Sequence, residues 1–217
     1  MRFSTSVLAG ALILGLAASF AQTGAAVRWT EGAPNSVTDI KNDNKVEGIK
    51  TDDIHIFASL ADIKETEYNR AWVQIANHSK APIEFDPQLA VLVNTGKGKP
   101  LPAENPGKAA NSVQKFGEAK SQEMSSAKCE NMISTQCQPA PTQLQVAKQI
   151  SQYSAQQAQW IKDNAIAKTT LAPGQEAQGV IVFKKDKKAA NYILRCPVGT
   201  QIFEFPVSAQ NKAPSYD

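Results

Sequence analysis

The sequence predicts a mainly β protein, an antiparallel β-sandwich that carries a long polar insertion and one inserted α-helix. Three observations predict this fold class. Six short segments have the apolar patterns of strands and end at turn-forming residues. A single amphipathic segment stands late and alone, which argues against repeated strand–helix–strand units. The stretch before that segment is poor in strongly apolar residues, which indicates an insertion into the sandwich.

The first 21 residues predict an export signal that is removed from the mature chain. Arg2 supplies a positive start, residues 7–16 are apolar, and Ser19 and Ala21 are small residues before a cut ahead of Gln22. Glycines interrupt the apolar run, and it is shorter than the ~20 residues that span a bilayer. We therefore expect a secreted or periplasmic protein with no stable membrane insertion once the signal is removed.

The charge of the chain excludes one class of partner, and its composition indicates where the folded domain begins and ends. The 23 basic and 20 acidic residues give a net charge of +3, which offers no electrostatic basis for binding nucleic acid. Residues 22–50 are rich in Gly, Asn, Asp and Lys, and Trp29 is their one large side chain, so we expect a flexible N-terminal leader there. The sandwich domain is expected over residues 51–208, followed by a C-terminal tail at 209–217.

Alternating apolar residues predict the first strands of the domain. Residues 54–60 and 71–75 each place apolar side chains at every second position, the signature of a strand with one buried face. This pattern puts His55 on an outward face. The second strand ends at the turn-forming cluster Asn77–Pro82, whose proline cannot donate to a sheet. A third extended segment starts at Ile83.

The polar insertion is expected over residues 97–142. Among its 46 residues, the strongly apolar ones are Leu101, Val113, Phe116 and Ile133, too few for a core of its own.

The inserted helix is expected over residues 143–166. Thr142 and Gln145 have the spacing of a capping box, and Val146, Ile150, Tyr153, Trp160 and Ile161 fall near one face. Two interpretations stay open: this stripe packs on the sheet, or Tyr153 and Trp160 form an exposed partner-binding stripe.

Three strands close the chain. The turn Leu171–Gly174 leads into a strand at 177–183, and further strands are expected at 192–198 and 202–207. In the last of these, Phe203, Phe205 and Val207 share one face while Glu204 points away.

Two segments carry a family resemblance. WVQIANHSKAPI (72–83) ends a strand in an Asn followed by a small turn and a Pro, and LAPGQEAQGVIVF (171–183) introduces a later strand with a Leu-x-Pro-Gly turn. Both resemble the small exported bacterial immunoglobulin-like domains of unknown function, also called telokin-like. The likeness covers residues 53–94 and 169–207 and implies an immunoglobulin-like sandwich, with no catalytic residues carried over. The insertion between these segments is longer than such domains usually carry.

Catalytic patterns are scarce in the sequence. Neither histidine, His55 or His78, lies in a Ser or Cys signature, so no catalytic, cofactor-binding or metal-binding residue is assigned. Our leading hypothesis is an exported, non-catalytic binding or envelope-accessory protein. One alternative is an envelope hydrolase whose carboxylates converge in space, which spacing does not reveal. Another is a pilus-chaperone-like assembly factor, suggested by the Asn77–Pro82 turn, which would lend an edge strand to its partner.

The three cysteines have different expected roles. Cys129 and Cys137 lie close together in a polar segment, so an oxidising compartment favours a disulfide between them. Cys196 lies in an apolar strand, where a buried, unreactive thiol is expected. A zinc site is disfavoured because the chain has no CxxC pair and its histidines have no partner at ligand spacing.

We predict that Cys129 and Cys137 are joined in the exported protein. Mass spectrometry after alkylation without reduction should leave both thiols unmodified, whereas reduction first should add two labels within this segment. Two labelled thiols without reduction would contradict the prediction.

Overall fold

The computed structural model describes residues 26–41, 44–63, 66–96, 98–126, 141–186, 189 and 191–208. The expected signal at 1–21, the tail at 209–217 and both Cys129 and Cys137 lie outside these ranges. In chain order the elements are β1 (Ala26–Arg28), β2 (Ser36–Lys41), β3 (Asn44–Lys50), β4 (Ile54–Asp62), β5 (Tyr68–Asn77), β6 (Ile83–Phe85), the short 3-10 helix η1 (Pro87–Leu89), β7 (Val91–Asn94), β8 (Pro100–Glu104), α1 (Pro106–Ser125), α2 (Pro141–Asn164), β9 (Thr169–Leu171), β10 (Glu176–Lys184), β11 (Asn191–Val198) and β12 (Gln201–Ser208).

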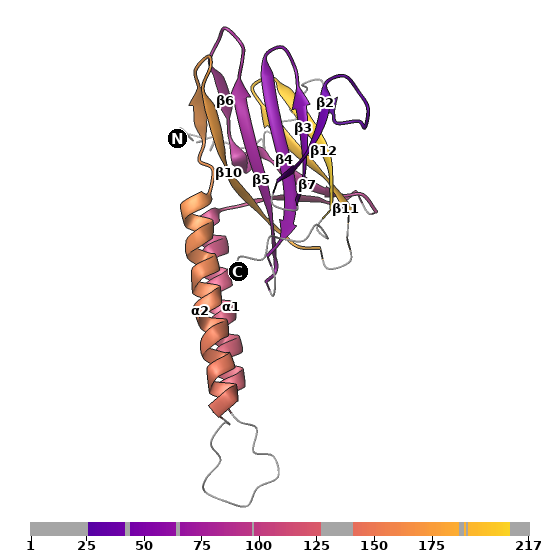
Figure 1. Ribbon diagram of the computed structural model, residues 1–217. Helices are drawn as coiled ribbons and strands as arrows, with labels where there is room; N and C mark the ends of the chain where they lie inside the picture. Colours follow the sequence, from indigo (N-terminus) through magenta and orange to yellow (C-terminus); the bar gives the residue numbers. More distant parts are fainter. Residues whose placement is uncertain are drawn as a thin grey trace, which may run out of the picture.

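The protein is mainly β, built on one curled sheet. Its strands follow the order β1-β12-β11-β7-β8-β10-β5-β4-β3-β2, with β6 and β9 paired beside β11 (Figure 1). Strand β8 pairs with β7 on one side and β10 on the other, so it joins the two halves of the sheet. One core fills the space between these halves, with Ile56 and Leu60 from β4 in the same cluster as Phe203 and Phe205 from β12.

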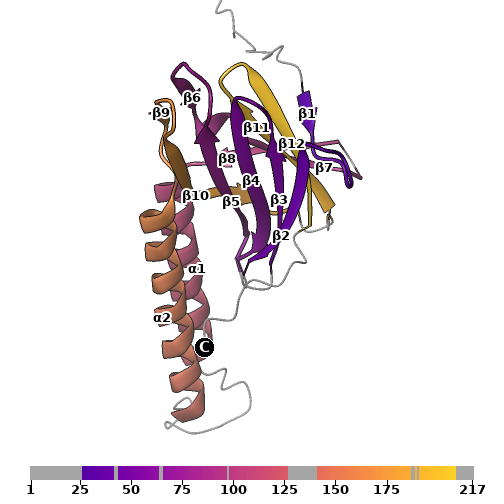
Figure 2. The same cartoon turned by 45° about the horizontal axis from the view of Figure 1, so that its top comes forward.

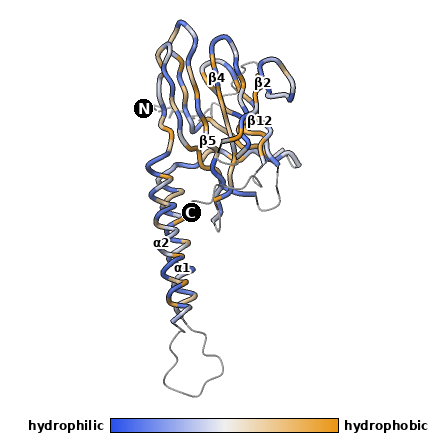
Figure 3. Tube along the Cα trace, in the orientation of Figure 1, coloured by the Kyte–Doolittle hydropathy of each residue, from blue (hydrophilic) through white to orange (hydrophobic). Residues whose placement is uncertain are grey.

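The strand alternation predicted from the sequence is confirmed in β4. Ile54, Ile56, Ala58 and Leu60 are buried, while the residues between them, His55 included, are only partly buried. Figure 3 shows the corresponding change between hydrophobic and hydrophilic residues along the strands. In β12, Phe203 and Phe205 enter the core as expected.

The expectation of a purely antiparallel sheet is wrong. Strand β1 pairs with β12 in parallel, with Ala26 opposite Ile202, so the sheet is mixed (Figure 2). The physical reason is an ion pair between Arg28 of β1 and Glu204 of β12, which lie opposite each other in the parallel register. Glu204 is 3% exposed, and its Oε2 accepts hydrogen bonds from Arg28 Nε and Nη2 at 2.9 and 2.7 Å. Arg195 Nε donates to Oε1 at 2.8 Å, so both carboxylate oxygens are bound.

The expectation of a flexible leader at residues 22–50 is also wrong, because β1, β2 and β3 lie within it. Val46 and Ile49 of β3 are 2% and 0% exposed, and β3 pairs with β4. Trp29 is 8% exposed and donates its Nε1–H to the carbonyl of Val37 at 3.0 Å. A few well-placed apolar residues suffice here because the segment covers a core that other strands supply.

The segment predicted as a polar insertion, 97–142, contains β8 and α1, so the described residues form two α-helices where the sequence predicts one. Asn105 caps α1: its Oδ1 accepts from Lys108 N at 3.1 Å, and Pro106 follows at the first helical position. The second helix begins at Pro141, so Thr142 is a helical residue rather than the predicted cap. A count of large apolar residues missed α1 because its buried face is made of small ones.

The two segments that carry the family resemblance meet at Asn77. This side chain is 1% exposed, and its Nδ2 donates to the carbonyls of Ala81 at 2.9 Å and Leu171 at 2.8 Å. The backbone N–H of Gly174, at φ 78°, donates to the carbonyl of Asn77 at 2.7 Å. The Asn-turn-Pro and Leu-x-Pro-Gly patterns are therefore two halves of one hydrogen-bonded corner.

Candidate functional site

Helices α1 and α2 form an antiparallel hairpin that extends away from the sheet as an arm (Figures 1 and 2). The helices have 20 and 24 residues. At a rise of 1.5 Å per residue, they are about 30 and about 36 Å long. None of the described residues of the arm belongs to the main core, so a separate set of contacts holds the arm together and attaches it to the sheet.

Small side chains form the seam between the two helices. The buried residues of the helices are Ala109, Ala110, Val113 and Gly117 in α1, and Ala147, Ser154, Ala158 and Ile161 in α2. A Cβ placed on Gly117 would overlap Ser154 Oγ and Cβ, so the two backbones approach closely at this level. Close approach gives extensive van der Waals contact between helices that have few large apolar residues to bury.

The root of the arm packs on the outer face of the sheet through a second core. This cluster joins Ala109 and Ile161 of the helices to Val180 and Val182 of β10, with Tyr68 of β5 beside them. The ring of Trp160 in α2 lies 4.5 Å from the guanidinium of Arg70 in β5, a cation–π contact.

Beyond the root, one side of the arm exposes large apolar residues. Phe116 is 39% exposed, Val146 41% and Tyr153 41%, and Ile150 is partly buried beside them. These four residues are called the arm face below. In an antiparallel helix pair, residues that directly precede the packed positions lie on the same side. Phe116 precedes Gly117, and Tyr153 precedes Ser154, so both helices contribute to one face.

The structure separates the two residues that the sequence singled out. Tyr153 and Trp160 lie seven residues apart on the same stripe of α2, but Trp160 is half-buried at the root while Tyr153 is exposed on the free arm. The predicted packing on the sheet therefore holds for the root alone. Phe116 was not singled out as a binding residue, because it lies in the segment interpreted as a polar insertion.

The two histidines, which the sequence left unconnected, meet at the other end of the sheet. Their ring centroids are 4.0 Å apart, because β4 begins beside the end of β5 and pairs Ile54 with Asn77. Burial lowers the pKa of His55, with smaller contributions from His78 and Lys50 in the same direction, while Glu176 opposes the shift.

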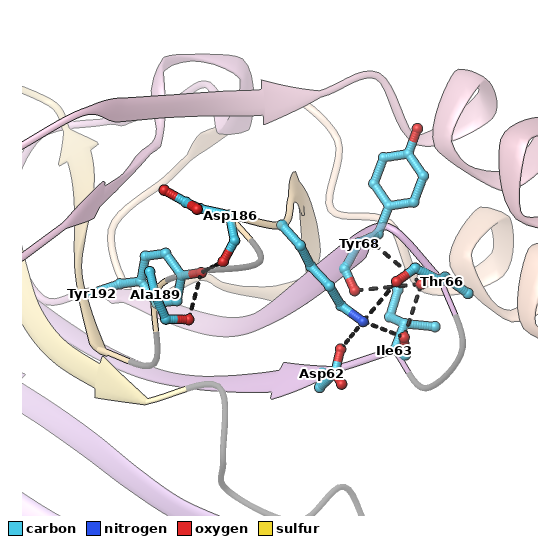
Figure 4. A network of polar contacts seen from close by, with 8 residues as sticks. Asp62, Ile63, Thr66, Tyr68, Asp186, Ala189 and Tyr192 are labelled. Carbon is cyan, nitrogen blue, oxygen red and sulfur yellow. Dashed lines mark hydrogen bonds and ion pairs between the residues drawn. The ribbon is translucent and has the colours of Figure 1, made fainter. Parts of the chain in front are cut away.

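A network of polar contacts joins the loop after β4 to the residues that follow β10, near the root of the arm (Figure 4). The Nζ of Lys185 donates to the carbonyls of Ile63 at 2.8 Å and Thr66 at 2.7 Å and forms an ion pair with Asp62. Tyr192 OH lies 3.2 Å from the carbonyls of Asp186 and Ala189, and burial raises its pKa. The lysine thus binds the carbonyls of the loop after β4 and fixes that loop to the end of β10.

Cys196 occupies the main core. It is fully buried, and burial alone raises the pKa of its thiol to about 12. The thiolate is the reactive form of cysteine, so this side chain is inert at neutral pH, as the sequence predicts.

Replacing Gly117 with Ala should destabilise the arm, because the added methyl group overlaps Ser154. We expect a loss of about 1–3 kcal/mol from overpacking, even though Ala favours helix over Gly. Far-UV circular dichroism followed during urea unfolding measures it. The double variant Gly117→Ala/Ser154→Gly should recover most of the loss, and a double variant as unstable as the single one would show that the seam is not the cause.

The folded protein should lose stability as the pH falls below the ordinary His pKa of about 6.5. A lowered pKa in the folded state means that the unfolded chain binds the proton more readily, so the contribution of His55 is complete above that pH and lost below it. Urea unfolding at about pH 7.5 and pH 5.5 should show the change, and His55→Gln should reduce it. An NMR titration of the folded protein should give His55 a pKa below the ordinary value of about 6.5, and a pKa at or above that value would contradict this explanation.

Within the described ranges, no three His, Cys, Asp or Glu side chains are grouped so that they could hold a metal ion. No helix in the part of the chain that the structure describes is both long and apolar enough to cross a membrane. Comparison with family models, with curated proteins and with solved structures found no match for this chain.

Proposed function

We propose that the chain is an exported, non-catalytic binding protein in which an immunoglobulin-like sandwich carries the helical arm as its binding part. The observation that carries this proposal is the arm face. Three large side chains, each about 40% exposed, lie on one side of a structure that projects from the body. Single exposed apolar residues are ordinary, whereas apolar residues gathered on one face of a projecting element are typical of a protein interaction site.

The composition of the arm supports the same proposal. Outside this face the described surface of the arm is rich in Gln and Lys, with Leu144 also exposed, at 47%. Phe116, Val146 and Tyr153 each keep about 40% of their surface exposed, because the seam beside them is closed by small residues. Binding a partner would give these side chains the burial that the fold does not provide.

The two alternatives have less support. A hydrolase of the proposed kind needs two carboxylates about 5–10 Å apart across a cleft. Two of the acidic side chains already make structural contacts. Asp62 forms an ion pair with Lys185, while Asp86 caps η1 and forms an ion pair with Lys168 at 3.4 Å. A pilus-chaperone-like factor would need an open edge beside the strand that ends at Asn77. That strand, β5, is paired with β4 on one side and β10 on the other.

Site-specific photo-crosslinking tests the proposal in the exporting cell. A photoreactive amino acid at Phe116 or Tyr153 should give discrete adducts, because these positions lie on the arm face. The matched control positions are Lys115 and Gln152, which are also exposed but directly precede the test positions and so point away from the face. Adducts at none of the four positions, or equally at all four, would refute a role for the arm face.

A further inference from the structure

The arm face has the pattern of a surface that packs against other helices. Val146 and Tyr153 are seven residues apart and Ile150 lies between them, which is the spacing of a helix-packing stripe. Phe116 adds an aromatic side chain from α1, the other helix of the arm. A two-helix face of this kind is completed when a second pair of helices packs on it, as in a four-helix bundle.

The charges beside the face indicate which helices would fit. Lys120 and Glu123 follow Phe116 by four and seven residues, so they lie along the same side of α1 with opposite signs. The two helices together have five lysines and three acidic residues, a mixed set rather than a strip of one sign. A polyanion or an anionic membrane would favour basic residues alone, whereas a two-fold symmetric partner requires both signs on the same patch.

The orientation of such a partner is limited by the body. The continuation of the arm face toward the root is covered by the chain's own sheet, with Ala109 buried there and Trp160 against Arg70. Two arms aligned in parallel would bring two bodies to the same place. An antiparallel alignment keeps the bodies at opposite ends, and a two-fold axis near Ser121 sets Lys120 of one copy opposite Glu123 of the other.

The available area suffices for a modest dimer. The 17 residues of α2 before Ala158, which belongs to the root core, extend about 25 Å at 1.5 Å per residue. Gly117 faces Ser154 and α1 ends at Ser125, so α1 lies beside α2 for about 18 Å of this length. At about 10 Å per helix, each copy offers about 430 Å² and the pair about 860 Å², the size of a weak interface that dissociates on dilution.

We propose that two copies of this chain bind each other through their arm faces, with the arms antiparallel in a four-helix bundle. The inference rests on the proposed function, because it names the partner of the same face. It assigns Phe116, Val146, Ile150 and Tyr153 to the buried centre of the interface. Lys120 and Glu123 form ion pairs at its margin.

Sedimentation velocity of the purified exported chain over a range of concentrations tests the pairing. The chain should sediment as a dimer that dissociates on dilution. Phe116→Ser/Tyr153→Ser should weaken the dimer by at least ~10-fold, since both copies lose their central aromatic residues. Leu144→Ser is the matched control. Leu144 is 47% exposed on the same helix but about 160° away from Val146, so its loss should leave the dimer intact.

Charge exchange tests the antiparallel geometry. Lys120→Glu or Glu123→Lys alone should weaken the dimer, because each variant places like charges opposite each other in both symmetric contacts. The combined variant Lys120→Glu/Glu123→Lys should restore it. Circular dichroism checks that every variant keeps its helices. Single variants as tight as the parent chain would overturn the antiparallel pairing.

The outcomes distinguish this inference from the proposed function. A chain that stays monomeric, but is crosslinked through Phe116 and Tyr153 to a different protein, overturns the dimer and supports a binding arm with another partner. A dimer that survives Phe116→Ser/Tyr153→Ser uses another surface and overturns this inference. A monomer without face-specific adducts overturns both proposals.

Discussion

Strand β10 is buried on both faces, and the placement of the arm depends on this. Residues 179–183 are all buried, although neighbouring side chains of a strand point in opposite directions. Ile181 and Phe183 enter the main core, while Val180 and Val182 enter the root core under the helices. Val180 and Val182 therefore contribute to the attachment of the arm, and Ile181 and Phe183 contribute to the core of the body.

The chain is fixed to this strand where it enters the arm and again where it leaves. Before α1, Glu104 of β8 pairs with Val182. After α2, Ile166 N donates to the carbonyl of Val180 at 3.2 Å. A Cβ at Gly179 would come within 2.8 Å of Asn164 O and Ile166 N, so this passage needs a glycine in the strand. Two fixed ends and a packed root give the hairpin a defined direction.

The sequence predicts the half-buried strands of the domain well, and the leader strands, β8 and the arm poorly, for physical reasons. A half-buried strand shows its face through alternation, as β4 does between Ile54 and Leu60. The seam of the arm consists mostly of Ala, Gly and Ser, and such small residues do not produce a recognisable pattern of large apolar side chains in the sequence. The first strand of the expected leader could not be predicted, because Arg28 of β1 is held by Glu204, which is 176 positions away in the chain. The continuous run Val180–Phe183 was visible, and a run of that kind is the signal for a strand buried on both faces.

A seam of small residues also explains why the arm presents large ones. Larger side chains at positions 117 and 154 would push the helices apart. Aromatic side chains therefore fit beside the seam, where Phe116 and Tyr153 lie. Among the described residues, the most exposed large apolar side chain is that of Ile40, at 73%, and it has a different setting. It stands alone on the edge strand β2, where its own N–H is bound by Asp39 Oδ1 at 2.8 Å. That contact uses a donor which strand addition would need, and a single side chain offers little area. Exposure alone therefore does not identify the interaction surface; the combination of exposure, grouping on one face and a defined direction does, and in the described residues the arm face has all three.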